Sequence, residues 1–264
     1  MIHVRTAAEV DTVGKGGAII AGLLEELPAR ISPGVTTAEL DAFCEKYIVS
    51  HDGAEPAFKG LYGFPGSVCV SVNEEVVHGI PSAKRVLADG DILSVDVGVR
   101  LDGWCSDSAW TFPVGRVSDE ATALLEITER ALEAAVEVAL AGNHVGDIGA
   151  AVIRTVEGTQ YGIIRELVGH GIGQDVHEEP QVPNVGRAGH GPLLREGMIL
   201  AIEPMLSAGS PDIRTRRDGW TVVTADRSLS AHFEHTVGIT GEGPRILTRV
   251  GAQANAVHNA AEGA

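Results

Sequence analysis

The sequence predicts an α+β fold made of two similar halves. Helical and strand-like patterns succeed one another along the chain in the order helices, strands, helices, strands. One segment of each half also matches the other: "ADGDILSVD" at 88–96 resembles "REGMILAIE" at 195–203, which aligns Asp96 with Glu203 at an offset of 107 residues. Internal similarity at a fixed offset indicates a repeated unit, so we expect a pseudo-twofold axis between the halves.

Two helices are predicted at the start of each half. Thr6 and Thr36 each open a capping box, with a glutamate three residues later, and apolar residues follow at helical spacing. Pro28 ends the first of these helices, because proline cannot continue a helix interior. In the second half, helical spacing covers about 119–141 and 146–158.

Strand-like runs follow each pair of helices. They cover about 67–73, 76–80, 91–101 and 104–112 in the first half, and about 162–173, 198–207, 220–224 and 230–240 in the second. We therefore expect a single domain over residues 1–248, with halves of about 1–115 and 116–248. The end of the chain, 249–264, lacks periodicity and aromatic residues, which is typical of a disordered tail.

The composition indicates a globular protein and argues against several functions. With 264 residues, of which 44% are hydrophobic, the chain can bury a large core, yet no apolar run approaches the roughly 20 residues that span a bilayer. Its net charge of −16 would repel phosphate backbones, so direct nucleic-acid binding is not expected. The N-terminus lacks the apolar core of a secretory signal, and three cysteines cannot pair completely, so we expect a cytoplasmic protein.

Two aspartates interrupt strand-like runs whose other residues are typical of buried strands. A turn centred on Asp102-Gly103 would make Asp96 and Asp107 diagonal neighbours on one face, and a turn centred between Leu101 and Asp102 would pair them directly. In both registers two carboxylates converge, and burying them costs several kcal/mol unless protons or cations intervene. A solvated hairpin face is the alternative for such a pair, and a metal ion is the simplest way to bury it.

Further acids and histidines lie in apolar or glycine-rich strand contexts. His170 and His177 occur in "LVGHGIGQDVHEEP", Glu203 in "ILAIEPML" and Glu234 in "SAHFEHTVGIT". A lone buried histidine is usually a hydrogen-bonded core residue, and a lone acid in a strand often faces water. Four acids and a histidine together make a mostly oxygen ligand set, which two divalent ions of Mn, Fe, Co or Zn would neutralise. Two metals that share carboxylates are a recognised arrangement for hydrolysis.

Taken together and in this order, these segments resemble the type I methionine aminopeptidases, members of the pita-bread family of dinuclear metallopeptidases. The resemblance runs from about residue 5 to residue 248. It is most specific in "SVCVSVNEEVVHGIP", "DGDILSVDVGVRLDGWCSDSAWTF", "VGHGIGQDVHEEPQVPN", "EGMILAIEPML" and "DGWTVVTADRSLSAHFEHT". It implies the pita-bread fold, a pseudo-twofold duplicated half with a central antiparallel sheet flanked by helices.

The resemblance also implies a ligand set and catalytic roles. Two divalent ions would be held by Asp96, Asp107, His170, Glu203 and Glu234, with Asp107 and Glu234 bridging them. His78 and His177 would contact the substrate around the scissile peptide, His78 by fixing the peptide and His177 by donating to the developing oxyanion. Glu203 would also carry the proton to the leaving nitrogen.

The implied substrate is the N-terminal methionine of nascent polypeptides and peptides, removed when the next residue is small. The methionine side chain would bind among Phe58, Leu61, Phe64, Cys69 and Trp220, whose apolar and polarizable surfaces suit a thioether. For each of these five residues the plain alternative is core packing. The family often has tyrosine or cysteine where this chain has Phe58, Leu61 and Phe64, which puts fine selectivity in question. We also expect the protein to be a monomer that associates transiently with ribosomes.

Two other functions are compatible with the same motifs. A prolidase or aminopeptidase P shares the fold and a similar metal set, but normally carries a large N-terminal domain for which this chain has no room. A catalytically inactive relative that binds peptides or ribosomes would have lost ligands, and all five are present. Neither HExxH nor GxSxG occurs, which argues against zincin and serine-hydrolase chemistry.

Overall fold

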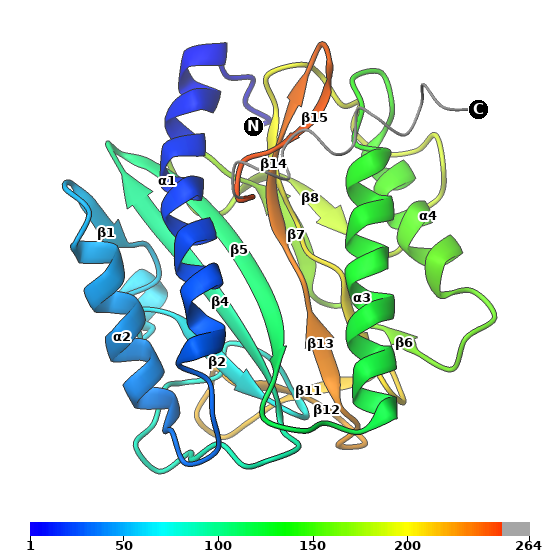
Figure 1. Cartoon of the computed structure of the whole chain (residues 1–264). Helices are drawn as coiled ribbons and strands as arrows, with labels where there is room; N and C mark the ends of the chain where they lie inside the picture. Colours follow the sequence, from blue (N-terminus) through cyan, green and yellow to red (C-terminus); the bar gives the residue numbers. More distant parts are fainter. Residues whose placement is uncertain (250–264) are drawn as a thin grey trace, which may run out of the picture.

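The computed structural model describes residues 1–249. It has a pita-bread fold in which strands fill the middle of the molecule and two pairs of helices cover them (Figure 1). The helices are α1 (Ala7–Glu26), α2 (Thr37–Val49), α3 (Asp119–Glu137) and α4 (Val145–Val156). All four confirm the predicted helices, and Thr6 and Thr36 form the expected capping boxes at the starts of α1 and α2. Predicted tail residues 250–264 lie outside the described part of the chain.

The first half forms a four-stranded antiparallel sheet. Its strands are β1 (Ala54–Pro56), β2 (Cys69–Val72), β4 (Ile92–Leu101) and β5 (Trp104–Pro113). The turn between β4 and β5 is centred on Asp102 and Gly103, both with positive φ, 51° and 80°. This two-residue turn sets the register, in which Asp96 lies opposite Ala109 and Gly98 lies opposite Asp107. Asp96 and Asp107 are therefore diagonal neighbours, as the first of the two predicted turns requires.

The second half forms a five-stranded sheet of order β15-β14-β9-β7-β8. Its strands are β7 (Val168–Gly171), β8 (Glu178–Pro183), β9 (Ile199–Ile202), β14 (His235–Thr240) and β15 (Gly243–Ile246). Two three-stranded sheets complete the fold, with strands β6 (Gly162–Ile163), β10 (Met205–Ser207) and β13 (Ser230–His232), and β3 (Glu75–Val77), β11 (Ile213–Thr215) and β12 (Val222–Thr224). Short 3₁₀ turns occur at Leu27–Ala29 and Leu61–Gly63.

Three predicted strands are each split in two. The run 162–173 becomes β6 and β7, 198–207 becomes β9 and β10, and 230–240 becomes β13 and β14. The second break falls at Glu203-Pro204, where proline has no N–H for the ladder. The third lies directly opposite, at Phe233-Glu234, because His235 pairs with Ile202 and His232 with Met205. The breaks therefore coincide with two of the predicted site acids.

The two halves repeat the same features at nearly the same offset. β4 begins at Ile92 and β9 at Ile199. The glycines before α2 and α4, Gly34 and Gly142, both have φ of +96°, and both N–H groups donate to the carbonyl of a leucine in the segment before the matching strand, at 2.8 and 3.0 Å. Bridges Thr36↔Val86 and His144↔Leu193 follow in the same places.

Side-chain bonds join the halves along β5 and β13–β14. Thr236 Oγ1 donates to the carbonyl of Asp107 at 2.7 Å, and Ser108 Oγ donates to the carbonyl of Glu234 at 2.6 Å. Each half has its own large apolar core, and Trp110 packs against both. Within residues 1–249, no helix combines the length and apolar character that a membrane span needs.

Candidate functional site

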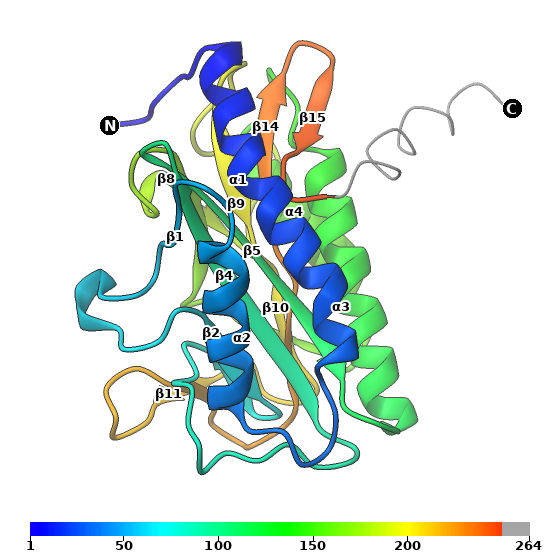
Figure 2. The same cartoon turned by 60° about the vertical axis from the view of Figure 1, so that its left-hand side comes forward.

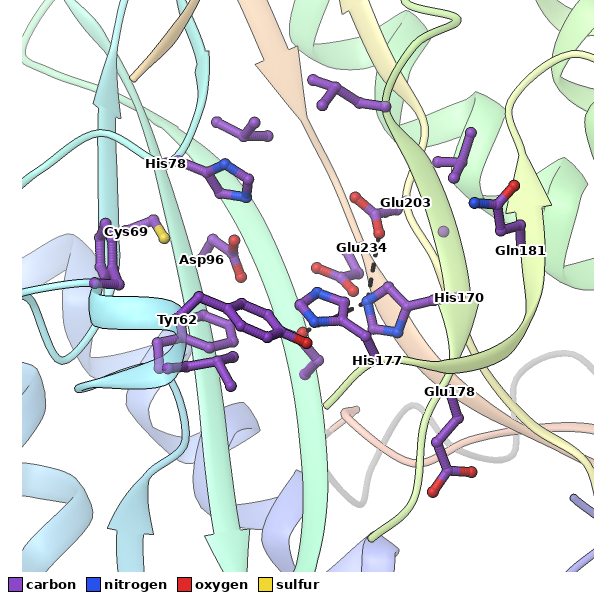
Figure 3. Close-up of a pocket in the computed structure, with 18 of the residues that line it drawn as sticks. Tyr62, Cys69, His78, Asp96, His170, His177, Glu178, Gln181, Glu203 and Glu234 are labelled. Atoms are coloured by element: carbon purple, nitrogen blue, oxygen red, sulfur yellow. Dashed lines mark ion pairs between the residues drawn. The ribbon is translucent and has the colours of Figure 1, made fainter. Parts of the chain in front are cut away.

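A cavity of about 520 Å³ opens where the two halves meet (Figure 3). All twelve predicted site residues line it: Phe58, Leu61, Phe64, Cys69, His78, Asp96, Asp107, His170, His177, Glu203, Trp220 and Glu234. One wall is acidic and histidine-rich, and the other is apolar. The fold thus brings together residues that lie up to 176 positions apart in the sequence.

Strand register places the acids. β4 and β5 put Asp96 and Asp107 on one face of the first sheet. In the second half, the pairs on either side of the break, Ile202↔His235 and Met205↔His232, share one register, so Glu203 falls opposite Glu234. The hydrogen bonds that join β5 to the β13–β14 segment then place Glu234 beside Asp107.

His170 directs one ring nitrogen at the acids. Its Nδ1 lies 2.9 Å from the carbonyl of Gly171, to which it donates, and this leaves the Nε2 lone pair facing the cavity. Nε2 lies 3.6 Å from Glu203 Oε1 and 3.9 Å from Asp107 Oδ2. One ligand atom each from Asp107, His170 and Glu234 lie within 4.8 Å of one another, a spacing that can hold a metal ion.

The buried carboxylates repel one another, and a bound cation would stabilise them. Buried oxygens of Asp96, Asp107 and Glu234 have no hydrogen-bond partner in the described part of the chain. Burial raises the pKa of Asp96 to about 6 and the pKa of Glu203 to about 8. Burial and neighbouring carboxylates raise the pKa values of Asp107 and Glu234 as well. Without a cation, burial favours the protonated forms of these groups, so the donor set fits divalent ions that accept oxygen and imidazole nitrogen.

The two predicted substrate-contacting histidines lie on opposite sides of the acids. His78 follows β3 with a positive φ of 59°, which is uncommon for a residue with a side chain. Gly79 holds this turn close to β2, because a Cβ there would lie 2.2 Å from the carbonyl oxygen of Val70. The ring of His177 packs on His170 at 4.5 Å between centroids. Burial lowers the pKa of His78 to about 4 and lowers that of His177, so both rings are neutral and keep an N–H donor.

The apolar wall is built from the loop before β2 and from Trp220. Phe64 meets the indole edge-on at 5.3 Å. Phe58 occupies the space that a side chain at residue 98 would need, since a Cβ on Gly98 would lie 2.5 Å from its ring. Cys69 pairs with Asp96 across β2 and β4. Burial, with the nearby Asp96 charge, raises the pKa of the Cys69 thiol well above its usual value, so this sulfur stays an uncharged, polarizable surface.

Several residues at the site were absent from the sequence prediction, and two of them contact predicted site residues. Tyr62 lines the cavity and stacks on His177 at 5.9 Å with a 22° angle between the rings. His232 lies 3.5 Å from Glu203 and 3.8 Å from Glu234. A signal for His232 existed, because it stands two positions before Glu234 in a strand-like run and period-two alternation places both on one face. Tyr62 offered no such signal.

Removing metal is expected to destabilise the protein. Ions that bind only the folded state add about 4 kcal/mol at a free concentration near 1,000 times the dissociation constant, which is roughly 8–16 °C in melting temperature for a domain of this size. Differential scanning fluorimetry with chelator, and then with added Mn²⁺ or Co²⁺, measures this shift. Identical melting curves in all conditions would contradict metal binding at the acidic cluster.

The metal-free protein should lose stability as the pH rises. Raised carboxyl pKa values stabilise the fold while the groups are protonated, so the contribution is complete below their unfolded pKa values near 4 and disappears as the pH passes about 6 for Asp96 and about 8 for Glu203. Metal replaces those protons, so the gap between loaded and stripped melting temperatures should widen from pH 5 to about 8.5. Parallel curves across this range would show that the acids are not the metal site.

The fold and this acidic, histidine-containing centre define a metallopeptidase. The sequence model of metallopeptidase family M24 matches residues 12–241, and the chain belongs to that family. Several curated relatives that match over nearly the whole chain are named methionine aminopeptidase. Methionine aminopeptidase 1 of Bacillus subtilis is 51% identical over 250 residues, which cover 95% of this chain and all of the relative.

Solved structures give the same picture. A crystal structure of methionine aminopeptidase from Thermotoga maritima superposes with a TM-score of 0.92 at 42% identity, covering 95% of this chain and 100% of that chain. A prolidase from Pyrococcus furiosus superposes with a TM-score of 0.75 at 22% identity, over 94% of this chain and 66% of that one. This second similarity shows a shared fold and nothing finer.

Proposed function

We propose that the protein removes the N-terminal methionine from peptides and nascent proteins whose second residue is small. The observation that carries this proposal is the adjacency of two walls in one cavity. The acidic wall can hold metal, and the apolar wall contains Phe64, Trp220 and the Cys69 sulfur. Its aromatic and sulfur surfaces suit a thioether side chain. The methionine aminopeptidase relatives support the same substrate.

The proposed cofactor is a pair of divalent ions of Mn, Fe, Co or Zn. Asp96, Asp107, His170, Glu203 and Glu234 would hold them, with Asp107 and Glu234 shared between the two. Such a centre supplies activation of water and polarisation of the peptide carbonyl. Orphaned oxygens on three of these acids and the short separations among them support this assignment.

Three side chains would complete the reaction. His177 has a neutral ring beside His170 and would donate to the oxyanion that develops on the scissile carbonyl. Glu203, with one carboxylate oxygen 3.6 Å from His170 Nε2, would carry a proton to the leaving nitrogen. His78 would fix the peptide by a hydrogen bond from the opposite side of the acids. Its strained backbone and its contact with Trp220 hold the ring in place.

We further propose a single domain over residues 1–248 that acts as a cytoplasmic monomer, engages ribosomes transiently and does not bind nucleic acid directly. All three cysteines are buried free thiols, which suits a reducing compartment. A net charge of −16 opposes contact with phosphate backbones.

A peptide panel tests the proposal. The metal-stripped protein is incubated with Met-Ala-Ser, Met-Lys-Ser and Ala-Pro, each divalent ion is restored in turn, and the products are identified by mass spectrometry. We expect metal-dependent release of methionine from Met-Ala-Ser, far slower cleavage of Met-Lys-Ser and no cleavage of Ala-Pro. Cleavage of Ala-Pro alone would establish a prolidase instead. Binding of Met-Ala-Ser without cleavage under any ion would establish an inactive peptide-binding relative.

A further inference from the structure

His232 is a buried histidine that the proposed reaction does not use. It ends β13, is 1% exposed, and within residues 1–249 neither of its ring nitrogens has a hydrogen-bond partner. A buried polar group without a partner costs about 1–3 kcal/mol. An imidazole is thus a poor choice for filling core space, and a specific role for this ring is expected.

The ring faces two of the proposed metal ligands. Nε2 lies 3.5 Å from Glu203 Oε2 and 3.8 Å from Glu234 Oε2. The other oxygen of Glu203, Oε1, lies 3.6 Å from Nε2 of His170. The Glu203 carboxylate therefore stands between two imidazoles, with one oxygen toward each.

His232 lies behind these ligands rather than among them. Of the described residues, those that line the cavity include Glu203 and Glu234 but not His232. This placement fits a side chain that orients a ligand and not one that binds the ion itself.

The backbone of His232 is fixed at both of its polar groups. The hydroxyl of Thr111 accepts from the His232 N–H at 2.9 Å and donates to the His232 carbonyl at 2.8 Å. Ser94 Oγ lies 2.9 Å from the same hydroxyl and can donate to it. Because this clamp comes from β5 in the other half, the imidazole is held in position from across the seam.

We propose that His232 is a positioning residue for the metal centre. Nε2 stands 3.5 Å from Glu203 Oε2, so a small shift of the carboxylate would complete an N–H···O bond from the ring. That bond would fix the carboxylate and leave Oε1 directed to the His170 side for metal binding and proton transfer. The same ring limits movement of Glu234. This inference rests on the proposed function, since it needs Glu203 to act as a ligand.

Two substitutions at His232 distinguish a role as hydrogen-bond donor from a role in filling space. His232→Gln keeps an N–H donor, whereas His232→Leu fills the space without one. His235→Leu is the matched control, because His235 is also buried but its Nδ1 bonds Thr248 at 2.8 Å and its ring packs on Trp110. Metal affinity of the stripped proteins is measured by calorimetry, and kcat and KM for Met-Ala-Ser are measured on the loaded ones.

We expect His232→Leu to weaken metal binding about 10–100-fold and to lower kcat by a similar factor with little change in KM. His232→Gln should recover most of both, and His235→Leu should match the wild type in metal affinity. Wild-type affinity in a folded His232→Leu protein, or a His232→Gln protein as weak as His232→Leu, would overturn the inference. If the wild type itself binds no metal and releases no methionine, the proposed function fails instead.

Measuring the ring tautomer of His232 tests the inference even if the His232→Leu protein does not fold. In ¹⁵N-histidine-labelled, Zn²⁺-loaded protein, long-range ¹H–¹⁵N correlations report which ring nitrogen carries the proton, and the missing signals of His232→Gln assign the residue. The expected result is a neutral His232 with its proton on Nε2, beside His170 with its proton on Nδ1. A His232 proton on Nδ1 would overturn the inference, because Nε2 could not then donate to Glu203.

Discussion

Replacing Asp107 or Glu234 by alanine is expected to abolish methionine release. Each of these acids would be shared by both ions, so either substitution removes charge and geometry from two sites at once. Activation of water and carbonyl by metal contributes several kcal/mol of transition-state stabilisation, and each 1.36 kcal/mol is a factor of ten. We therefore expect kcat/KM for Met-Ala-Ser to fall at least about 1,000-fold, with fewer ions retained per chain.

Metal content measured by atomic emission, beside the rate assay, checks this prediction. Glu55→Ala serves as the control: Glu55 lies on β1, and its carboxylate pairs with Arg100 at 3.7 Å on the surface, outside the cavity. Such an exposed pair contributes little, so activity and metal content should stay unchanged. Full metal content in both Asp107→Ala and Glu234→Ala proteins would remove these acids from the centre.

Replacing Trp220 by alanine should damage substrate recognition while leaving the metals in place. The indole lines the cavity, meets Phe64 edge-on at 5.3 Å and lies 6.4 Å from the ring of His78. Loss of a large aromatic contact costs about 2–4 kcal/mol, which is a fall in kcat/KM of roughly 30- to 1,000-fold. Part of that binding energy positions the carbonyl, so kcat should fall along with a rise in KM.

The substrate series makes this test specific. Trp220→Ala should lose most on substrates that begin with methionine and least on those that begin with alanine, and its metal content should equal that of the wild type. A Trp220→Ala enzyme with normal kinetics on Met-Ala-Ser would show that the methionine pocket lies elsewhere, even where the acids do bind metal.

Local chemistry made much of this fold predictable. Two capping boxes located the first two helices, and Asp102-Gly103 favours the two-residue turn that sets Asp96 and Asp107 diagonally. The match between 88–96 and 195–203 corresponds to β4 and β9, which begin at the same place in each repeat. These features depend on neighbours in sequence, so a single chain reveals them.

Four strands were not predicted, and all four lie at the ends of their sheets. β1, β8, β11 and β15 each stand at one end of a sheet order. Three of them contain proline, at Pro56, Pro180 with Pro183, and Pro244, and proline argues against a central strand but is tolerated where one side needs no N–H donor. These segments form strands because a neighbouring strand offers them hydrogen-bond partners, and their own sequence pattern does not indicate a strand.

The family resemblance implied twelve of the residues that line the cavity, without the links among them. His232 was not among the predicted site residues, although it stands two positions before Glu234. Its orphaned nitrogens and its 3.5 Å separation from Glu203 depend on a clamp by Thr111, 121 positions away. Whether a buried polar group has a hydrogen-bond partner depends on segments that meet only in the folded core. Spacing along the sequence does not predict it.

The position of bound metal tests the central claim most directly. Crystals of the Zn²⁺-loaded protein, measured on both sides of the zinc absorption edge, give anomalous difference maps that locate each ion and identify it as zinc. The account predicts two peaks among Asp96, Asp107, His170, Glu203 and Glu234, both lost in Asp107→Ala crystals. An absence of peaks there at full metal occupancy in solution, or peaks bound by other residues, would contradict it.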